Sequence, residues 1–107
     1  MSKYGNRKTI WKGITFDSKK EAEYARDLQL DPSVESVEYQ VKYPVVVNGK
    51  KICVYIADFK VKFKDGSEQV IDVKPYDERK RKFYVTPLFL LKKKLVEALH
   101  HIDIILT

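Results

Sequence analysis

The sequence of 107 residues and 12.6 kDa can bury one hydrophobic core but not two, and its 44% hydrophobic and 34% charged residues favour a folded domain over a disordered chain. The only cysteine, Cys53, excludes an internal disulfide and a cysteine-based zinc site, and no run of 18 apolar residues predicts a membrane-spanning helix. The net charge of +6 and the pI near 9.3 favour a polyanionic partner such as nucleic acid, so we expect one cytoplasmic domain over residues 1–107 without membrane association.

The N-terminal part of the chain predicts a basic arm followed by a helix. Residues 1–12 are polar and basic, and we expect them to pack loosely or to become ordered on a partner. Residues 19–30 are expected to form a short amphipathic helix, with Ser18 as its N-cap and Pro32 just beyond its end. Its buried face is predicted to consist of Ala22, Ala25, Leu28 and, less regularly, Tyr24.

Three strands are predicted in the middle of the chain. Residues 33–47 and 51–64 have the apolar patterns of strands, and the sequence VNGKK between them indicates a hairpin turn. The sequence DGS indicates a second turn, after which residues 68–74 form the third strand.

The C-terminal part predicts a loop, a helix and a final strand. Residues 75–85 are strongly charged and are expected to be a loop. Residues 86–101 are predicted to form a helix with Thr86 as N-cap and Pro87 at its first position, and residues 102–106 a buried strand. The expected fold class is therefore α/β, a single domain in the order helix, three antiparallel strands, helix, strand, with a mixed sheet.

Two aspartates interrupt the apolar pattern of the strands beside the DGS turn. In the predicted strand over residues 51–64, the odd-numbered residues form one apolar face, and Asp58 lies on the other face. A two-residue turn would set Phe59 against Asp72, which is unfavourable. A three-residue turn over DGS pairs Phe59 with Val73, and its glycine can adopt the positive φ that such turns need. This register predicts Asp58 opposite Lys74 and diagonal to Asp72.

Two carboxylates at this spacing repel each other, so a cation is expected between them. Mg²⁺ takes one or two carboxylates and completes its shell with water and phosphate oxygens. Lys74 could then orient or deprotonate a metal-bound water, or stabilise a pentavalent phosphate. The alternative is a cross-strand ion pair between Asp58 and Lys74, with Asp72 solvated beside Lys60. The spacing alone favours the ion pair.

Asp58, in the sequence IADF, is followed after thirteen residues by Asp72-Val73-Lys74, in the sequence IDVK. This pattern resembles the motif of the PD-(D/E)XK nuclease superfamily. The whole chain is similar to a family of small, mainly phage and prophage encoded endonuclease-like proteins. The similar stretches are KYGNRKT, GITFDSKKEAEYARDL, YIADF, VIDVK and TPLFLLKKKLVEAL. The resemblance implies a restriction-endonuclease-like core, αβββαβ, and reverses the preference for an ion pair. The sequence PYDERKRKFYV departs from the family, in which a glycine and a shorter link would be expected.

The resemblance also implies roles for individual residues. It makes Asp58 and Asp72 ligands of Mg²⁺ or Mn²⁺, with the backbone carbonyl of Val73 as a third ligand, and Lys74 the catalytic lysine. Glu21 corresponds to a first-helix glutamate that completes the site through a metal-bound water. The alternative for Glu21 is a capping box with the residue three positions before it, and the two roles are compatible.

The remaining candidates are residues that would contact substrate. Tyr55 and Thr86 are secondary candidates near the motif. Basic residues in the charged loop and in the second helix could grip backbone phosphates, although three lysines in a row on a helix are more often a solvated face. The predicted DNA-binding residues are Lys80, Arg81, Lys82, Lys92, Lys93 and Lys94.

The expected function is that of a Mg²⁺- or Mn²⁺-dependent DNA endonuclease, in which a metal-activated water attacks the phosphodiester in line. A chain of this size covers little of a duplex, so we expect a homodimer, with branched or recombination DNA in phage DNA metabolism as a candidate substrate. Two alternatives remain. One is a non-catalytic nucleic-acid-binding module, and the other is an adaptor that binds a phage or host replication or recombination protein.

Overall fold

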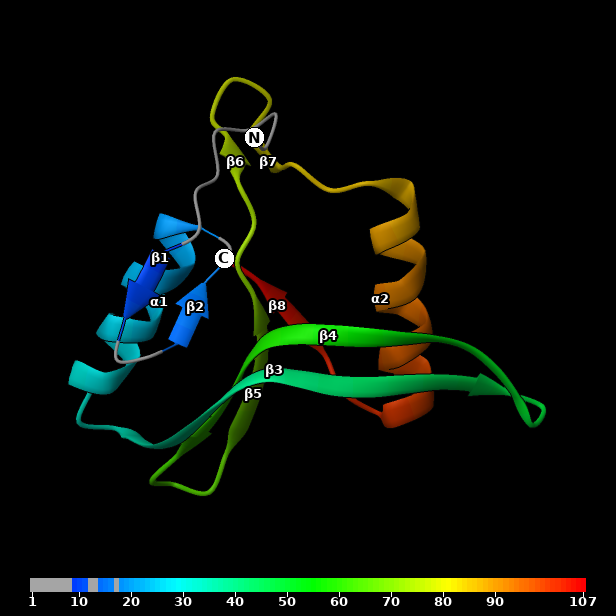
Figure 1. The fold of residues 1–107 in the computed structure, drawn as a ribbon, viewed down its shortest axis with the longest axis horizontal. Helices are drawn as coiled ribbons and strands as arrows, with labels where there is room; N and C mark the ends of the chain where they lie inside the picture. Colours follow the sequence, from blue (N-terminus) through cyan, green and yellow to red (C-terminus); the bar gives the residue numbers. More distant parts are fainter. Residues whose placement is uncertain (1–8, 12–13, 17) are drawn as a thin grey trace.

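The computed structural model describes residues 9–11, 14–16 and 18–107, and over these residues the chain has an α/β fold. Two helices lie apart, on either side of a four-stranded sheet in the view of Figure 1. The elements of this core are α1 (Lys19–Leu30), α2 (Pro87–His100), β3 (Val34–Val47), β4 (Lys50–Phe63), β5 (Glu68–Asp72) and β8 (Ile104–Leu106). The predicted order of helix, three strands, helix, strand is confirmed.

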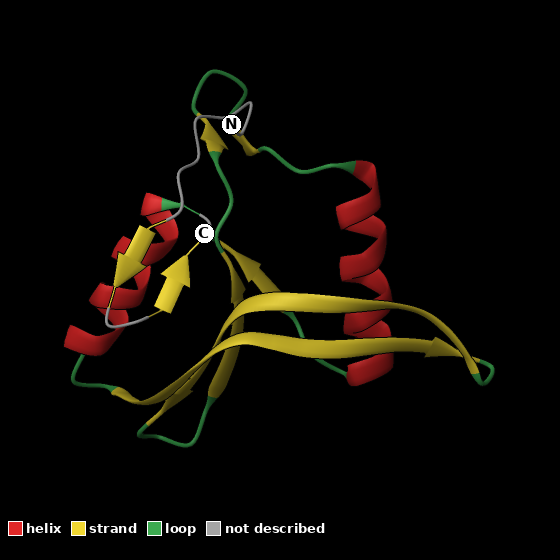
Figure 2. Ribbon diagram, viewed as in Figure 1, coloured by secondary structure: helices red, strands yellow, loops and turns green. Residues whose placement is uncertain are grey.

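The sheet has the strand order β3-β4-β5-β8. Its first three strands are antiparallel, and β8 pairs in parallel with β5 after the crossover through α2. Figure 2 shows the long β3–β4 hairpin reaching far beyond the other two strands. The sheet is thus mixed, as predicted, and it brings the end of β5 beside the middle of β4.

Two small hairpins were not predicted. The first pairs β1 (Thr9–Trp11) with β2 (Ile14–Phe16), so the expected arm is wrong for residues 9–11, while the other residues of that arm lie outside the described part. The second pairs β6 (Tyr76–Asp77) with β7 (Lys82–Phe83), inside the segment that was expected to be a loop. This second hairpin was missed because its residues are mostly charged, and strands are predicted from an alternation of apolar and polar residues.

Both helices begin at the predicted residues, because hydroxyl groups cap them. Ser18 Oγ accepts a hydrogen bond from the Glu21 amide at 3.1 Å, and Thr86 Oγ1 accepts one from the Phe89 amide at 3.0 Å. Helix α2 ends at His100 and is capped by His101, which has a left-handed backbone. In the described residues, neither helix is long and apolar enough to cross a membrane.

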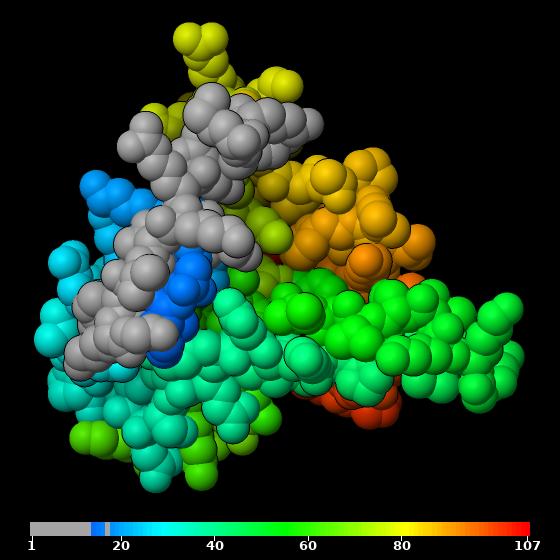
Figure 3. Space-filling view, in the orientation of Figure 1, coloured from blue at the N-terminus to red at the C-terminus, as the bar shows by residue number. Residues whose placement is uncertain are grey.

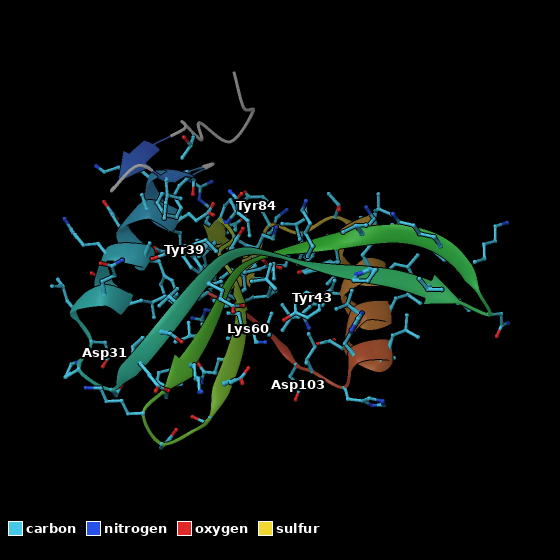
Figure 4. The ribbon with its side chains drawn as sticks, turned by 60° about the horizontal axis from the view of Figure 1, so that its bottom comes forward. Asp31, Tyr39, Tyr43, Lys60, Tyr84 and Asp103 are labelled. Carbon is cyan, nitrogen blue, oxygen red and sulfur yellow. The ribbon has the colours of Figure 1, made fainter. Side chains whose placement is uncertain are left out.

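The hairpin β3–β4 bends sharply, and the bend divides the core in two. Phe59 and Val61 pack in a cluster with α1, whereas Tyr55 and Ala57 pack in a second cluster with α2, although all four are odd-numbered residues of β4. Figure 4 accordingly shows Tyr39 on the α1 side and Tyr43 on the α2 side. The odd-numbered residues of β4 thus form the buried apolar face, as predicted, but this face is divided between the two helices.

The bend coincides with an unusual backbone conformation. Gln40, with φ of 52°, lies in β3 between the residues paired with Phe59 and Ala57, opposite Asp58. A left-handed residue inside a strand costs about 1–2 kcal/mol and interrupts regular pairing. The strain thus lies next to the first aspartate of the motif.

The β4–β5 register differs from the prediction by two residues. Phe59 lies opposite Ile71 rather than Val73. The turn closes one residue earlier than expected, with the Phe63 amide donating to the Ser67 carbonyl at 2.9 Å. The cause is local, because Asp65 accepts hydrogen bonds from both the amide and the hydroxyl of Ser67. A shift of two residues keeps every side chain on its predicted face.

Candidate active site

A cavity of about 320 Å³ lies where the start of α1, the middle of β4 and the segment after β5 meet. Three of the four predicted catalytic residues, Glu21, Asp58 and Lys74, line it together with Val73, whereas Asp72 does not. The complete lining is Ser18, Lys20, Glu21, Asp58, Val73, Lys74 and Pro75. Three segments that are separate in the sequence therefore converge at this point.

Asp58 and Asp72 connect their strands in a reciprocal way. The Asp58 amide donates to Asp72 Oδ1 at 2.8 Å, and the Val73 amide donates to Asp58 Oδ2 at 2.8 Å. These side-chain bonds continue the pairing beyond Phe59 and Ile71, where the backbone ladder ends. The two aspartates are thus opposite each other, and the predicted diagonal placement was wrong.

Asp72 is anchored inside the protein, with only 2% of its surface exposed. The Tyr55 hydroxyl donates a hydrogen bond to Asp72 Oδ2. Burial raises the pKa of the Asp72 carboxyl, although the Asp58 amide and the ammonium groups of Lys74 and Lys93 act in the opposite direction. The alternative interpretation, in which Asp72 is solvated beside Lys60, is therefore wrong.

Lys74 is positioned by an aromatic ring that sequence reasoning missed. Its ammonium nitrogen lies 4.2 Å from the ring centroid of Phe89, in the first turn of α2. Phe89 in turn packs against Tyr55, with the two ring centroids 6.0 Å apart. A cation held over an aromatic face has less freedom than one on a solvated side chain. The only sequence signal for Phe89 was an aromatic residue just after the helix cap.

A second lysine at the cavity was also missed. Lys20 Nζ donates to the backbone carbonyl of Lys74 at 2.6 Å and lies 5.6 Å from the ring centroid of Phe83. Lys20 therefore connects the first turn of α1 with the segment after β5 and with β7. Its position beside Glu21 at a helix N-terminus, where anions bind, was the available signal.

Glu21 is nearly as buried as Asp72, with 5% of its surface exposed. The structure shows one half of the predicted capping box, the bond from the Glu21 amide to Ser18 Oγ. The Glu21 side chain also lines the cavity with Asp58. The geometry thus accommodates both predicted roles.

The predicted DNA-binding residues fall into two groups. Lys80, Arg81 and Lys82 are exposed on the β6–β7 hairpin, which begins directly after Pro75 at the cavity. The three lysines of α2 point in different directions, as consecutive helical residues must. Lys93 Nζ lies 3.0 Å from Glu97 Oε2, and Glu97 also accepts a hydrogen bond from the Ile104 amide at 2.8 Å. Lys93 therefore supports the contact between α2 and β8.

The oxygen atoms at the cavity suit a hard divalent cation. Within the described residues no group of three His, Cys, Asp or Glu side chains could hold a metal ion as a complete cage. Mg²⁺ does not require such a cage, because it usually binds one or two carboxylates and takes its other ligands from water and substrate phosphate. Glu21 and Asp58, which line the cavity together, provide the two carboxylates.

The fold and the cavity define a small α/β protein with carboxylate and lysine side chains gathered beside the two central strands of a mixed sheet. The chain belongs to the family described as protein of unknown function (DUF1064), whose sequence model matches residues 1–104. No curated protein matches the chain at a significant level.

Proposed function

We propose that this protein is a divalent-metal-dependent endonuclease that hydrolyses phosphodiester bonds in DNA. The observation that carries the proposal is the convergence of Glu21, Asp58 and Lys74 from three separate segments on one cavity. Two carboxylates can hold a catalytic metal ion and a lysine can stabilise developing charge, which suits metal-assisted phosphodiester hydrolysis. The motif resemblance to the PD-(D/E)XK nucleases supports the same chemistry.

Asp58 and Glu21 would hold the Mg²⁺ or Mn²⁺ ion, and the resemblance adds Asp72 and the Val73 carbonyl as further ligands. When bound, the ion supplies a water of lowered pKa and polarises the phosphate. The amide of Val73 holds Asp58 Oδ2 and thereby orients the carboxylate. Asp72, bonded to the Asp58 amide and to Tyr55, fixes the backbone from which Asp58 projects.

Lys74 supplies the positive charge that the reaction needs beside the carboxylates. Its ammonium group can position the attacking water or stabilise charge that develops on the phosphate. The ring of Phe89 holds this ammonium group, so less side-chain entropy is lost on substrate binding. Lys20 fixes the backbone at the same residue through its bond to the Lys74 carbonyl.

The basic surface would bind the DNA backbone. The net charge of +6 favours polyanions, and Lys80, Arg81 and Lys82 extend from the cavity edge on an exposed hairpin. Lys92 and Lys94 on α2 add further charge. Because the domain is small, a homodimer would allow two cuts on opposite strands. Branched or recombination DNA, in a phage or host cytoplasm, would suit such a pair of sites.

Cleavage of a DNA panel tests the proposal. Supercoiled plasmid, linear duplex, flap and four-way junction are incubated with Mg²⁺, with Mn²⁺ and with EDTA. We expect cleavage with either metal, none in EDTA, and none with the Asp58→Asn variant. DNA binding without cleavage in any metal would instead identify a non-catalytic binding module, and co-purification with a replication protein without DNA affinity would identify an adaptor.

A further inference from the structure

The hairpin β6–β7 is a built structure rather than a loose loop. Asp77 Oδ1 accepts hydrogen bonds from the Arg79 amide at 2.9 Å and the Lys80 amide at 3.3 Å. Asp77 Oδ2 accepts one from the Tyr84 hydroxyl at 3.0 Å, and the Tyr84 amide donates to the Pro75 carbonyl at 2.8 Å. Figure 3 shows the hairpin, in yellow-green, projecting from the body of the molecule. Its shape is therefore fixed by bonds within the segment.

Two tyrosine rings are held on this hairpin with much of their surface in solvent. Tyr76 is 47% exposed, and its ring meets Phe83 edge to face with centroids 5.0 Å apart. Tyr84 is 43% exposed, and its hydroxyl is bonded to Asp77. Lys20 lies over the Phe83 ring and supports the hairpin from α1. The Tyr76 ring is thus oriented by its contact with Phe83 and the Tyr84 ring by its hydroxyl bond, and both rings are only partly buried.

Four consecutive cations surround the tip, and all four are exposed: Arg79, Lys80, Arg81 and Lys82. The hairpin begins one residue after Pro75, which lines the cavity with Lys74. A nucleic-acid strand that crosses the hairpin would therefore continue into the cavity. Cationic side chains beside exposed aromatic rings are the combination that binds single strands, because phosphates meet the charges while bases stack on the rings.

We propose that the β6–β7 hairpin binds an unpaired nucleobase, which stacks on Tyr76 while the neighbouring phosphates contact the basic tip. A base inside a continuous duplex is stacked on its neighbours and cannot reach this ring. The substrate class is therefore a strand with unpaired nucleotides beside the cavity, as in a single strand, a flap or a junction. The inference deepens the proposed nuclease function, but the binding step itself needs no metal.

The test measures equilibrium binding by fluorescence anisotropy in EDTA, where no cleavage occurs. The probes are an oligothymidylate, an oligouridylate, an abasic oligonucleotide of equal length and a blunt duplex. We expect the oligothymidylate to bind about 10-fold more tightly than the abasic strand, and Tyr76→Leu to remove most of that difference. Oligothymidylate and oligouridylate compared directly show whether DNA or RNA is preferred.

Two variants serve as matched controls. Tyr76→Phe keeps the ring and should keep the preference for bases. Lys80→Gln removes a charge but no ring, so it should weaken the binding of the normal and abasic strands equally and lower the salt dependence of both. If Tyr76→Leu does not fold, the comparison of normal with abasic strands in the wild-type protein remains a test, because equal affinities would overturn the inference.

Equal affinity of the wild-type protein for normal and abasic strands would overturn the inference, and so would an unchanged preference in Tyr76→Leu. These results are distinct from failure of the proposed function. Base-dependent binding without cleavage in Mg²⁺ or Mn²⁺ would support the hairpin site and refute the nuclease. Cleavage without base-dependent binding would do the reverse.

Discussion

The two helices begin with the same kind of cap, yet each carries a glutamate with a different role: Glu97 is half-buried and joins two elements of the fold, whereas Glu21 is buried beside a cavity. Glu97 of α2 has a lysine and the Ile104 amide as partners, and together they join α2 to β8. Glu21 of α1 lines a cavity together with Asp58 and Lys20. A carboxylate whose partners come from packed elements is part of the fold, whereas one that shares a cavity with other charged groups is a candidate for chemistry.

The strongest test of this difference is Lys74→Ala, since Lys74 lines the cavity and contacts both Lys20 of α1 and Phe89 of α2. We expect single-turnover cleavage to fall by about 100-fold or more, because the lost charge acts on the transition state. The fold should persist, with a stability loss of roughly 0.5–1 kcal/mol from the missing contact with Phe89. Lys64→Ala, in the exposed turn after β4, is the control and should cleave normally. Full nuclease activity in Lys74→Ala would refute the catalytic role.

The next test replaces each glutamate by its uncharged isostere. Glu21→Gln should lower cleavage by about 10-fold or more and weaken Mn²⁺ binding in calorimetry, with little effect on the melting temperature. Glu97→Gln should lower the free energy of unfolding by roughly 1–2 kcal/mol, since it weakens two charge-assisted bonds, and leave cleavage per folded molecule unchanged. The opposite pattern would reverse the assignment of the two helices.

Acid unfolding tests the role of Glu97 further. Burial alone would raise the pKa of Glu97, but the Ile104 amide and Lys93 outweigh it, so the pKa is lowered from its ordinary value of 4.5. A lowered folded-state pKa adds stability above the ordinary value, and that stability is lost as the pH falls through the folded pKa. The stability difference between wild type and Glu97→Gln should therefore shrink between roughly pH 5 and 3 in urea titrations. A constant difference would contradict the ion pair.

The helices and the overall order were predictable from sequence because their signals are local. Ser18 and Thr86 mark where the helices begin, and hydroxyl capping acts within three residues. The pairing of apolar faces also gave the correct sides of β4 and β5. The register was out of reach, since it depended on how Asp65 bonds to Ser67 within the turn.

The candidate site was predictable only in part. The spacing of the motif indicated Asp58 and Lys74, but the contacts of Lys74 with Phe89 and Lys20 join elements far apart in sequence. The division of one strand face between two helices follows from the bend at Gln40, for which the sequence has no glycine signal. The surroundings of Lys74 and the division of the β4 face therefore depend on long-range packing, which local sequence patterns do not reveal.

The smallest expected effect compares two adjacent lysines of α1. Lys20→Gln removes the bond to the Lys74 carbonyl and one charge at the cavity, whereas Lys19→Gln removes an equal charge from a side chain that is 82% exposed and loosely paired with Glu23. We expect Lys20→Gln to weaken DNA binding about 3- to 10-fold and to lower the salt dependence by about one phosphate contact. Lys19→Gln should change neither by much, because a solvated ion pair contributes little.

Affinity measured over a range of salt concentrations makes this comparison independent of cleavage, because both variants can be studied in EDTA. The two substitutions carry the same change in net charge, so a general loss of electrostatic attraction would weaken binding equally in both. A selective loss in Lys20→Gln would place a phosphate at the cavity, next to the N-terminus of α1 where anions are stabilised. Equal losses would instead indicate that DNA contacts this helix only through its overall charge, and the phosphate position would then have to be sought along the β6–β7 hairpin.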